Sequence, residues 1–475
     1  MIEKNAILCI IFLITFLRAV IKRFRGDLDT SYLFVSLFVI CTPFIFDWPV
    51  IELTGKAVIR GRNVSESLGV FGNAIVLTAP LLISLMMVVS GFYKVSKESL
   101  KLKNNTWLLV FIALCLISFI NPYNTFKNAI FPALFSIIQL TILFKLFESN
   151  FDRGKILRGV FDGLAVLTLI SLITCILYPI LNIKEAVTFM YGQKGLLQSL
   201  RRAGYPATIG LFSHPNPLGF FTLIPIVFFI SCYLNNYQNK AAVSFLILSN
   251  LFVCFFTFSR TSFLGILIAI VVLVLVYNNK AKLAVRKQTI VTIAIFSVGF
   301  LCLFLYLTFN QNLLLFIDTD KMMDAREAHW VLGYELWKQS EILGVGLNSH
   351  VYYMAHHDFS YTGYSNAFTV NVAIHNIHFI ILAETGLLGI IAWFTFVVLK
   401  IKALLNFKIN DAAGYVIFNM TFLAVLVGAI VVGIFDTSPS PASTLPLILF
   451  FGYFAVETGS SPVQSSRKHN LKNFV

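Results

Sequence analysis

Long apolar runs separated by short polar segments follow one another along nearly the whole chain. A helix needs ~20 mainly apolar residues to cross a bilayer, so each run predicts a membrane-spanning helix. The last run is the weakest, because it is short and contains Pro446. The runs cover about 5–21, 31–46, 69–92, 106–121, 128–147, 159–183, 216–234, 243–258, 261–277, 289–309, 377–399, 414–435 and 444–457. The pattern therefore predicts an all-α polytopic membrane protein with about 12–13 transmembrane helices.

Composition supports this fold class and excludes others. The chain has 475 residues, of which 58% are hydrophobic and 12% charged, against about 25% charged in an average soluble protein. These values exclude a soluble globular domain and a disordered chain. The seven cysteines all fall within or at the edges of apolar runs, and the sequence has no Cys-x-x-Cys motif. We therefore expect neither disulfides nor a metal site.

The net charge of +14 is explained by topology. Basic residues gather in alternate loops, and the positive-inside rule places such loops in the cytoplasm. The C-terminus then lies inside, while an odd number of spans would put the N-terminus outside. A nucleic-acid partner is not required by this charge. The basic segments lie at 18–25, 94–103, 145–158, 240, 280–287 and 400–408, and in a tail at 459–475.

Three long segments fall on the opposite, extracytoplasmic side, at about 47–68, 184–215 and 310–376. The third is the largest loop of what is otherwise a single membrane domain covering residues 1–475. It contains DAREAHWVLGYELW, which predicts an amphipathic helix with Arg326, Trp330, Gly333 and Trp337 on one face. Such a helix serves either as a passive interfacial anchor or as part of a site.

Ionisable residues at the end of this loop suggest chemistry. His375 and His378 stand three residues apart at the mouth of a predicted span, and Glu384 lies deeper in the same apolar run. An ionisable group inside a span is costly and is a functional candidate by default. His375 is placed to act as a general base, although an interfacial histidine that anchors the helix is an equally simple interpretation.

Arginines on the outer side suggest an anionic substrate. Arg201 and Arg202 lie in the second long segment, Arg260 lies in a very short turn between two spans, and Arg326 opens the amphipathic helix. Guanidinium groups bind phosphates in a bidentate manner, so converging arginines fit a pyrophosphate. Salt bridges to the loop acids are the alternative. His214 and Asn216 precede a span and either line the same cavity or simply start the helix.

Four ordered pieces of this sequence resemble the O-antigen ligase and polymerase superfamily. They are RRAGYPATIGLFSHPNPLG, FTFSRTSFLG, AREAHWVLGYELW with LGVGLNSH, and HNIHFIILAETGLLG, together covering roughly Leu200 to Gly389. The resemblance implies a GT-C-like helical fold. It also implies transfer of a glycan from undecaprenyl pyrophosphate to a sugar hydroxyl at the outer face of the bacterial cytoplasmic (inner) membrane, with no metal or other cofactor.

The resemblance also assigns site residues. The family's arginines map to Arg260, Arg326 and one of the Arg201–Arg202 pair, its His-Asn motif to His375–Asn376, and its following glutamate to Glu384. His375, Arg260 and Arg326 are the predicted catalytic residues. The predicted substrate-binding residues are Arg201, Arg202, His214, Asn216, Trp330, Asn376, His378 and Glu384.

Three functions remain open from the sequence. The favoured one is a polymerase of lipid-linked repeat units of an O-antigen, capsule or exopolysaccharide, because GLFSHPNPLG resembles the polymerase branch and the chain is long for a ligase. The alternatives are an O-antigen ligase that transfers glycan to lipid A–core and a flippase of lipid-linked oligosaccharides. The expected partners are the undecaprenyl-pyrophosphate-linked donor, a glycan acceptor, the lipid bilayer and a chain-length regulator.

Overall fold

The computed structural model describes about half of the chain, and it confirms a mainly helical membrane protein. Among the described residues, six helices are long and apolar enough to cross a membrane: Ile156–Ile180, Pro215–Leu234, Lys240–Thr257, Arg260–Asn279, Ile377–Leu404 and Val416–Phe435. The predicted runs at 5–21, 128–147, 289–309 and 444–457 and the tail at 459–475 lie outside the described residues. The described residues are 31–41, 49–52, 58–59, 62–63, 76–78, 106–118, 153–184, 201–202, 205–212, 215–281, 319–346, 350, 353, 374–406 and 413–436.

Three short antiparallel sheets of two strands each accompany the helices. β1 (Pro49–Glu52) pairs with β4 (Val76–Thr78), β2 (Val58–Ile59) with β3 (Arg62–Asn63), and β5 (Arg201–Arg202) with β6 (Tyr205–Pro206). The prediction of an uninterrupted span at 69–92 is wrong at β4. β-branched Val76 and Thr78 favour extended backbone, and Pro80 follows closely.

Close glycine contacts join the first described helix to the third. α2 (Ser31–Cys41) packs along α7 (Arg153–Cys175), and α7 continues into a π-helical turn at Ile176–Ile180 that contains Pro179. An added Cβ on Gly159 would overlap the carbonyl oxygen of Tyr32, and one on Gly163 would lie 2.7 Å from Cβ of Val39. These two glycines, four residues apart, let the two backbones touch, as small residues commonly do in membranes.

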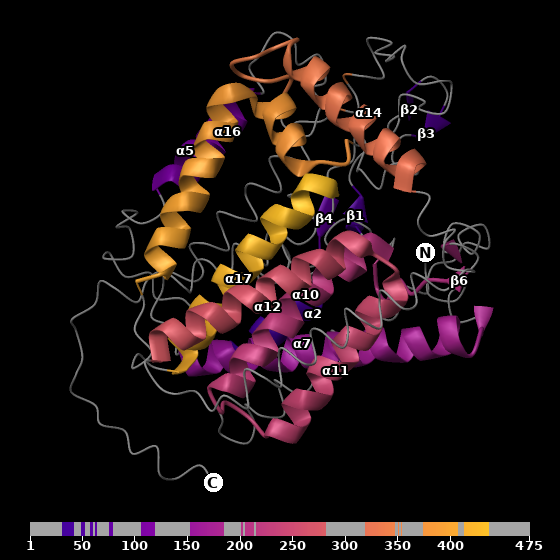
Figure 1. Cartoon of the computed structure of the whole chain (residues 1–475), viewed down its shortest axis with the longest axis vertical. Coiled ribbons are helices and arrows are strands. Elements are labelled where there is room, and N and C mark those ends of the chain that lie inside the picture. Colours follow the sequence, from indigo (N-terminus) through magenta and orange to yellow (C-terminus); the bar gives the residue numbers. More distant parts are fainter. Residues whose placement is uncertain are drawn as a thin grey trace.

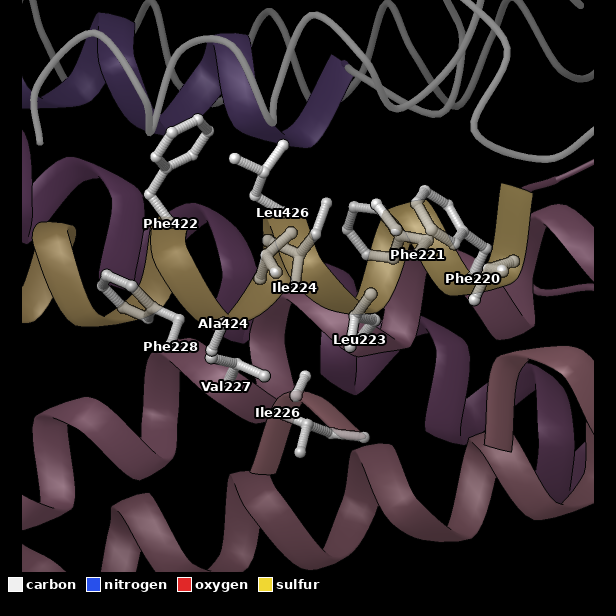
Figure 2. Close-up of a cluster of buried hydrophobic side chains, with 14 of the residues drawn as sticks. Phe220, Phe221, Leu223, Ile224, Ile226, Val227, Phe228, Phe422, Ala424 and Leu426 are labelled. Carbon is white, nitrogen blue, oxygen red and sulfur yellow. The ribbon is translucent and has the colours of Figure 1, made fainter. Parts of the chain in front are cut away.

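α10 (Pro215–Leu234) lies at the centre of the described bundle. It packs against α11 (Lys240–Thr257), α12 (Arg260–Ala281) and α17 (Ala413–Phe435). Its phenylalanine and aliphatic side chains join those of α17 in one buried cluster (Figure 2). Polar contacts add to this packing: Thr421 donates a hydrogen bond to Ser231 at 3.2 Å, and Asn250 donates to Thr168 at 2.8 Å.

The remaining helices form the side of the bundle that faces the large loop. α5 (Thr106–Ser118) packs on α16 (Ile377–Leu404), while α14 (Thr319–Trp337) belongs to the predicted loop 310–376. α14 and the start of α16 lie together near the C-terminal end of α17, at the top of the view (Figure 1). A helix therefore forms over the stretch predicted to be amphipathic, and it packs on the bundle. Its buried face carries His329, Gly333 and Leu336, shifted from the predicted one.

The two ends of the bundle differ in their chemistry. At one end, Lys240 lies over the ring of Tyr233 at 5.4 Å and Lys400 over that of Phe396 at 5.6 Å, as basic side chains do near a membrane surface. The N-termini of α10, α12 and α16 and the C-termini of α11 and α17 meet at the other end. The predicted site residues that the structure describes gather at this second end.

Candidate functional site

Arg260 begins α12 after a turn held by buried hydroxyl groups. Oγ of Ser259 lies 2.7 Å from Oγ of Ser262, and the backbone N–H of Ser259 donates to Oγ1 of Thr257 at 3.2 Å. Phe258 takes the left-handed conformation that ends α11. These contacts satisfy polar groups at two helix ends and leave Arg260 half-buried at the tip of the turn.

Two parts of the sequence piece RRAGYPATIGLFSHPNPLG pack against the Arg260 turn. Gly219 of α10 packs so closely that an added Cβ would lie 2.8 Å from Oγ of Ser262 and 2.9 Å from Cβ of Ser259. The N–H of Thr208, in the YPATIG stretch, donates to the carbonyl of Phe256 at 2.9 Å. Two of the four sequence pieces therefore form one packed structure around Arg260.

Asp436 at the end of α17 joins this turn, and sequence reasoning missed it. Its carboxylate is buried and accepts a hydrogen bond from the hydroxyl of Thr261 at 3.4 Å. The signal was present, because Asp436 follows a long apolar run directly. The hydrogen bond from Thr261 gives the buried carboxylate a partner, since a buried polar group without one is costly.

The same end of α17 reaches the large loop and α16. The ring of Phe435 lies 6.0 Å from that of Trp330 on α14, between ring centroids. A Cβ on Gly433 would overlap the side chain of Ile377, and Nε2 of His378 lies 3.1 Å from the carbonyl oxygen of Ile430. The end of α17 therefore connects the Arg260 turn with the region of His375.

His375 lies just before α16 and contacts a second histidine. Its half-buried ring meets the ring of His329 edge to face, with centroids 4.8 Å apart. Burial, and secondarily the nearby His375, lower the pKa of His329 from 6.5 to about 4. At neutral pH His329 is therefore uncharged, and it places no positive charge beside His375.

Asn376 and His378 are used in packing and capping. The Asn376 side chain caps α16 by accepting hydrogen bonds from the N–H groups of His378 at 2.9 Å and Phe379 at 3.0 Å. The ring of His378 stacks on Phe394, with centroids 5.5 Å apart. Both residues were predicted to bind substrate, and both hold the His375 segment in place.

Glu384 is buried and pairs with a histidine of the large loop. Its Oε1 lies 2.5 Å from Nδ1 of His350. This pairing explains how an ionisable group is kept inside an apolar helix. His350 belongs to the LGVGLNSH motif, but sequence reasoning did not select it as a site residue.

A comparison with known families decides the classification. Residues 242–394 match the family model described as O-antigen ligase. Over this segment the chain is similar to the O-antigen ligase family. The resemblance expected from the sequence is thus confirmed. No curated protein matches the chain.

The O-antigen ligase segment contains Arg260, Arg326, Trp330, His375, Asn376, His378 and Glu384. Arg326 lies in α14, one turn before His329 and Trp330. The segment therefore joins the Arg260 turn, α14 and the start of α16, which the contacts above bring to the same end of the bundle.

The remaining predicted residues precede the O-antigen ligase segment. Arg201 and Arg202 form β5 of a tight hairpin that leads into the YPATIG stretch, and Asn216 lies half-buried in the first turn of α10. His214 lies outside the described residues. Among the residues that the structure describes, no group of three or more metal-ligand side chains comes together.

Proposed function

We propose that the chain is a polymerase that joins repeat units of a surface polysaccharide carried on undecaprenyl pyrophosphate. Its similarity to the O-antigen ligase family supports glycan transfer of this general kind. The observation that carries the proposal is the convergence of the Arg260 turn, α14 and His375 at one end of the bundle. Of the described basic residues from the alternate loops, Lys240 and Lys400 lie at the opposite end, which supports an extracytoplasmic site and a cytoplasmic C-terminus in the inner membrane.

The proposed reaction transfers the growing glycan to a hydroxyl of the incoming unit. The acceptor oxygen forms a bond to the anomeric carbon of the donor, and the bond from that carbon to the pyrophosphate oxygen breaks. Undecaprenyl pyrophosphate leaves with the bonding electron pair. The hydroxyl proton passes to the ring of His375, which acts as the base and afterwards gives the proton up to solvent.

Arginines are proposed to stabilise the leaving group. Arg260 and Arg326, with one of Arg201 and Arg202, would bind the pyrophosphate and offset the charge that develops on its oxygen. Fixed guanidinium groups supply the role that a divalent cation fills in other enzymes, so we propose a metal-independent reaction. The Trp330 ring beside Phe435 is proposed to contact the sugar.

The closest rival is an O-antigen ligase, which would use the same donor and a lipid A–core acceptor. The family match does not favour one acceptor over the other. The GLFSHPNPLG stretch favours the polymerase. Neither the family match nor the described contacts support a flippase.

A deletion strain tests the proposal. Loss of the gene should accumulate single lipid-linked repeat units on the outer leaflet, and the wild-type chain should restore long polymer. Full-length glycan that remains on its lipid carrier without transfer to lipid A–core would instead indicate the ligase. Repeat units held on the inner leaflet would indicate the flippase.

A further inference from the structure

We propose that His350 and Glu384 form a positioning pair that locks the large outer loop to a break in α16 and thereby sets the place of His375. This inference rests on the proposed glycan transfer for its activity measurements. The residue added to the proposed site is His350. Its Nδ1 binds Glu384, and His350 acts on His375 through the helix segment that follows His375.

The break in α16 lies at Gly386, whose φ is 67°. It separates a short segment, Ile377–Thr385, from the longer part of the span. Such a break leaves backbone N–H and C=O groups without partners inside the helix, which is costly at membrane depth. These groups must find partners elsewhere.

The loop after α14 supplies those partners. The N–H groups of Val345 and Gly346 donate to the carbonyls of Ala383 at 2.8 Å and Glu384 at 3.0 Å. In return, the N–H of Leu387 donates to the carbonyl of Glu341 at 2.8 Å. The LGVG stretch therefore docks into the helix break as a short piece of paired backbone.

Glycine is needed on both sides of this joint. A Cβ on Gly344 would overlap the carbonyl of Glu384, and a Cβ on Gly386 would overlap the carbonyl of Ile342. Both residues also have positive φ, at 72° and 67°. His350, a few residues further along the loop, contacts Glu384 beside this close approach.

The His350–Glu384 pair closes the joint. Oε1 of Glu384 accepts a hydrogen bond from Nδ1 of His350 at 2.5 Å. It also lies 3.4 Å from the backbone nitrogen of His350. Both side chains are buried, with 8% and 4% of their surface exposed. Removing either partner would leave the other buried without its hydrogen bond, so the pair holds the loop and helix together.

The tautomer follows from these contacts. Nδ1 carries the proton that Glu384 accepts, whereas Nε2 is buried and has no hydrogen-bond partner among the described residues. Burying an unprotonated ring nitrogen without a partner costs less free energy than burying a ring N–H, because no hydrogen-bond donor is left unsatisfied. The functional atom of His350 is therefore Nδ1.

The short helix segment links the His350–Glu384 pair mechanically to His375. Ile377–Thr385 is a rigid helix of about 13 Å at 1.5 Å per residue. Asn376 caps its beginning beside His375, and the His350–Glu384 pair fixes its end. Loosening the end would let the beginning shift, and displacements near 1 Å lower rates by about 100-fold.

Substitutions that mimic one ring nitrogen at a time test the proposal. The amide nitrogen of Asn stands near the place of Nδ1, and that of Gln near the place of Nε2. We expect kcat of purified protein in liposomes to fall about 100-fold in His350→Ala and His350→Gln, but by less than about 10-fold in His350→Asn. KM should change little, because the pair is proposed to act through the position of His375 and not through a contact with substrate. Glu335→Gln, an exposed carboxylate of α14, is the matched control and should behave like wild type.

A double substitution and a stability measurement complete the test. In a Glu384→Ala background, His350→Asn should no longer have a higher kcat than His350→Gln, because the carboxylate that binds the side chain at position 350 is gone. Thermal unfolding should follow the same order, with His350→Asn closest to wild type. If wild-type protein elongates no lipid-linked repeats, the proposed function fails, and the unfolding order still tests the pair. Gln equal to or better than Asn, or an Asn advantage that survives Glu384→Ala, would overturn the inference.

Discussion

The rings of His329 and His375 meet edge to face, with their centroids 4.8 Å apart. One belongs to the amphipathic helix of the large loop and the other to the start of a membrane span. His329 is buried, with 4% of its surface exposed, and remains neutral at physiological pH. The loop helix therefore supplies an uncharged aromatic wall beside the proposed base.

The pKa of His329 predicts how stability depends on pH. In the folded state this pKa is about 4, against 6.5 for the ordinary side chain, because burial disfavours the charged ring. Between these values the unfolded chain binds a proton that the folded chain does not, so stability falls as pH falls from 6.5 to 4. The loss reaches about 3 kcal/mol at most. His329→Phe should remove this part of the pH dependence, measured by thermal unfolding in detergent at pH 7 and pH 4.5. An unchanged difference between the two pH values would contradict it.

Gly386→Ala should weaken the joint between the loop and α16. The added methyl group would overlap the carbonyl of Ile342, in a backbone conformation that L-residues avoid. We expect a loss of about 3 kcal/mol or more, combining strain and a displaced backbone contact. Thermal unfolding of the purified protein measures it. Leu387→Ala, at the neighbouring exposed position, is the control and should lose less than about 1 kcal/mol.

Gly159→Leu should separate α2 from α7. The side chain would enter the space now occupied by the backbone of Tyr32 and the side chain of Val35. Overpacking of this kind costs about 1–3 kcal/mol or more. The change should lower the amount of folded protein extracted from membranes, whereas Leu169→Ala, on an exposed part of α7, should not. Equal yields of the two variants would show that the close contact is not needed.

The helices and several site residues could be predicted because their signals are local. Apolar runs marked all six described spans, and Glu384 stood out as a charge inside such a run. Arg260 stood out because the positive-inside rule predicts its short turn to lie on the outer side, which disfavours basic residues. Each of these inferences needs only the neighbouring sequence.

The partners of these residues could not be predicted in the same way. His350 lies 34 positions before Glu384, and the two meet only because the loop docks into the break at Gly386. Helix periodicity placed Arg326, Trp330 and Gly333 on one face. Packing against Phe379 and Ile374 instead buries the face through Gly333 and His329. Such outcomes depend on contacts between distant segments, which no local pattern encodes.

Removal of divalent cations should leave the reaction intact. The proposed charge stabilisation comes from arginines, so polymer formation in excess EDTA should stay within about twofold of that with Mg²⁺. A metal-dependent glycosyltransferase, assayed in parallel, is the control for effective chelation. Loss of activity in EDTA with recovery on adding Mg²⁺ would refute the metal-independent mechanism.

In the proposed reaction, Arg260 and His375 at one end of the bundle promote glycan transfer from a lipid pyrophosphate. Purified protein in liposomes, supplied with undecaprenyl-pyrophosphate-linked repeat units, measures this directly as a ladder of longer lipid-linked glycans. We predict that wild type and Lys338→Ala, an exposed basic residue of α14, form the ladder. Arg260→Ala and His375→Ala should each slow it about 100-fold or more while remaining folded. If the folded Arg260→Ala and His375→Ala variants form the ladder at the wild-type rate, the proposed roles of Arg260 and His375 in glycan transfer are refuted.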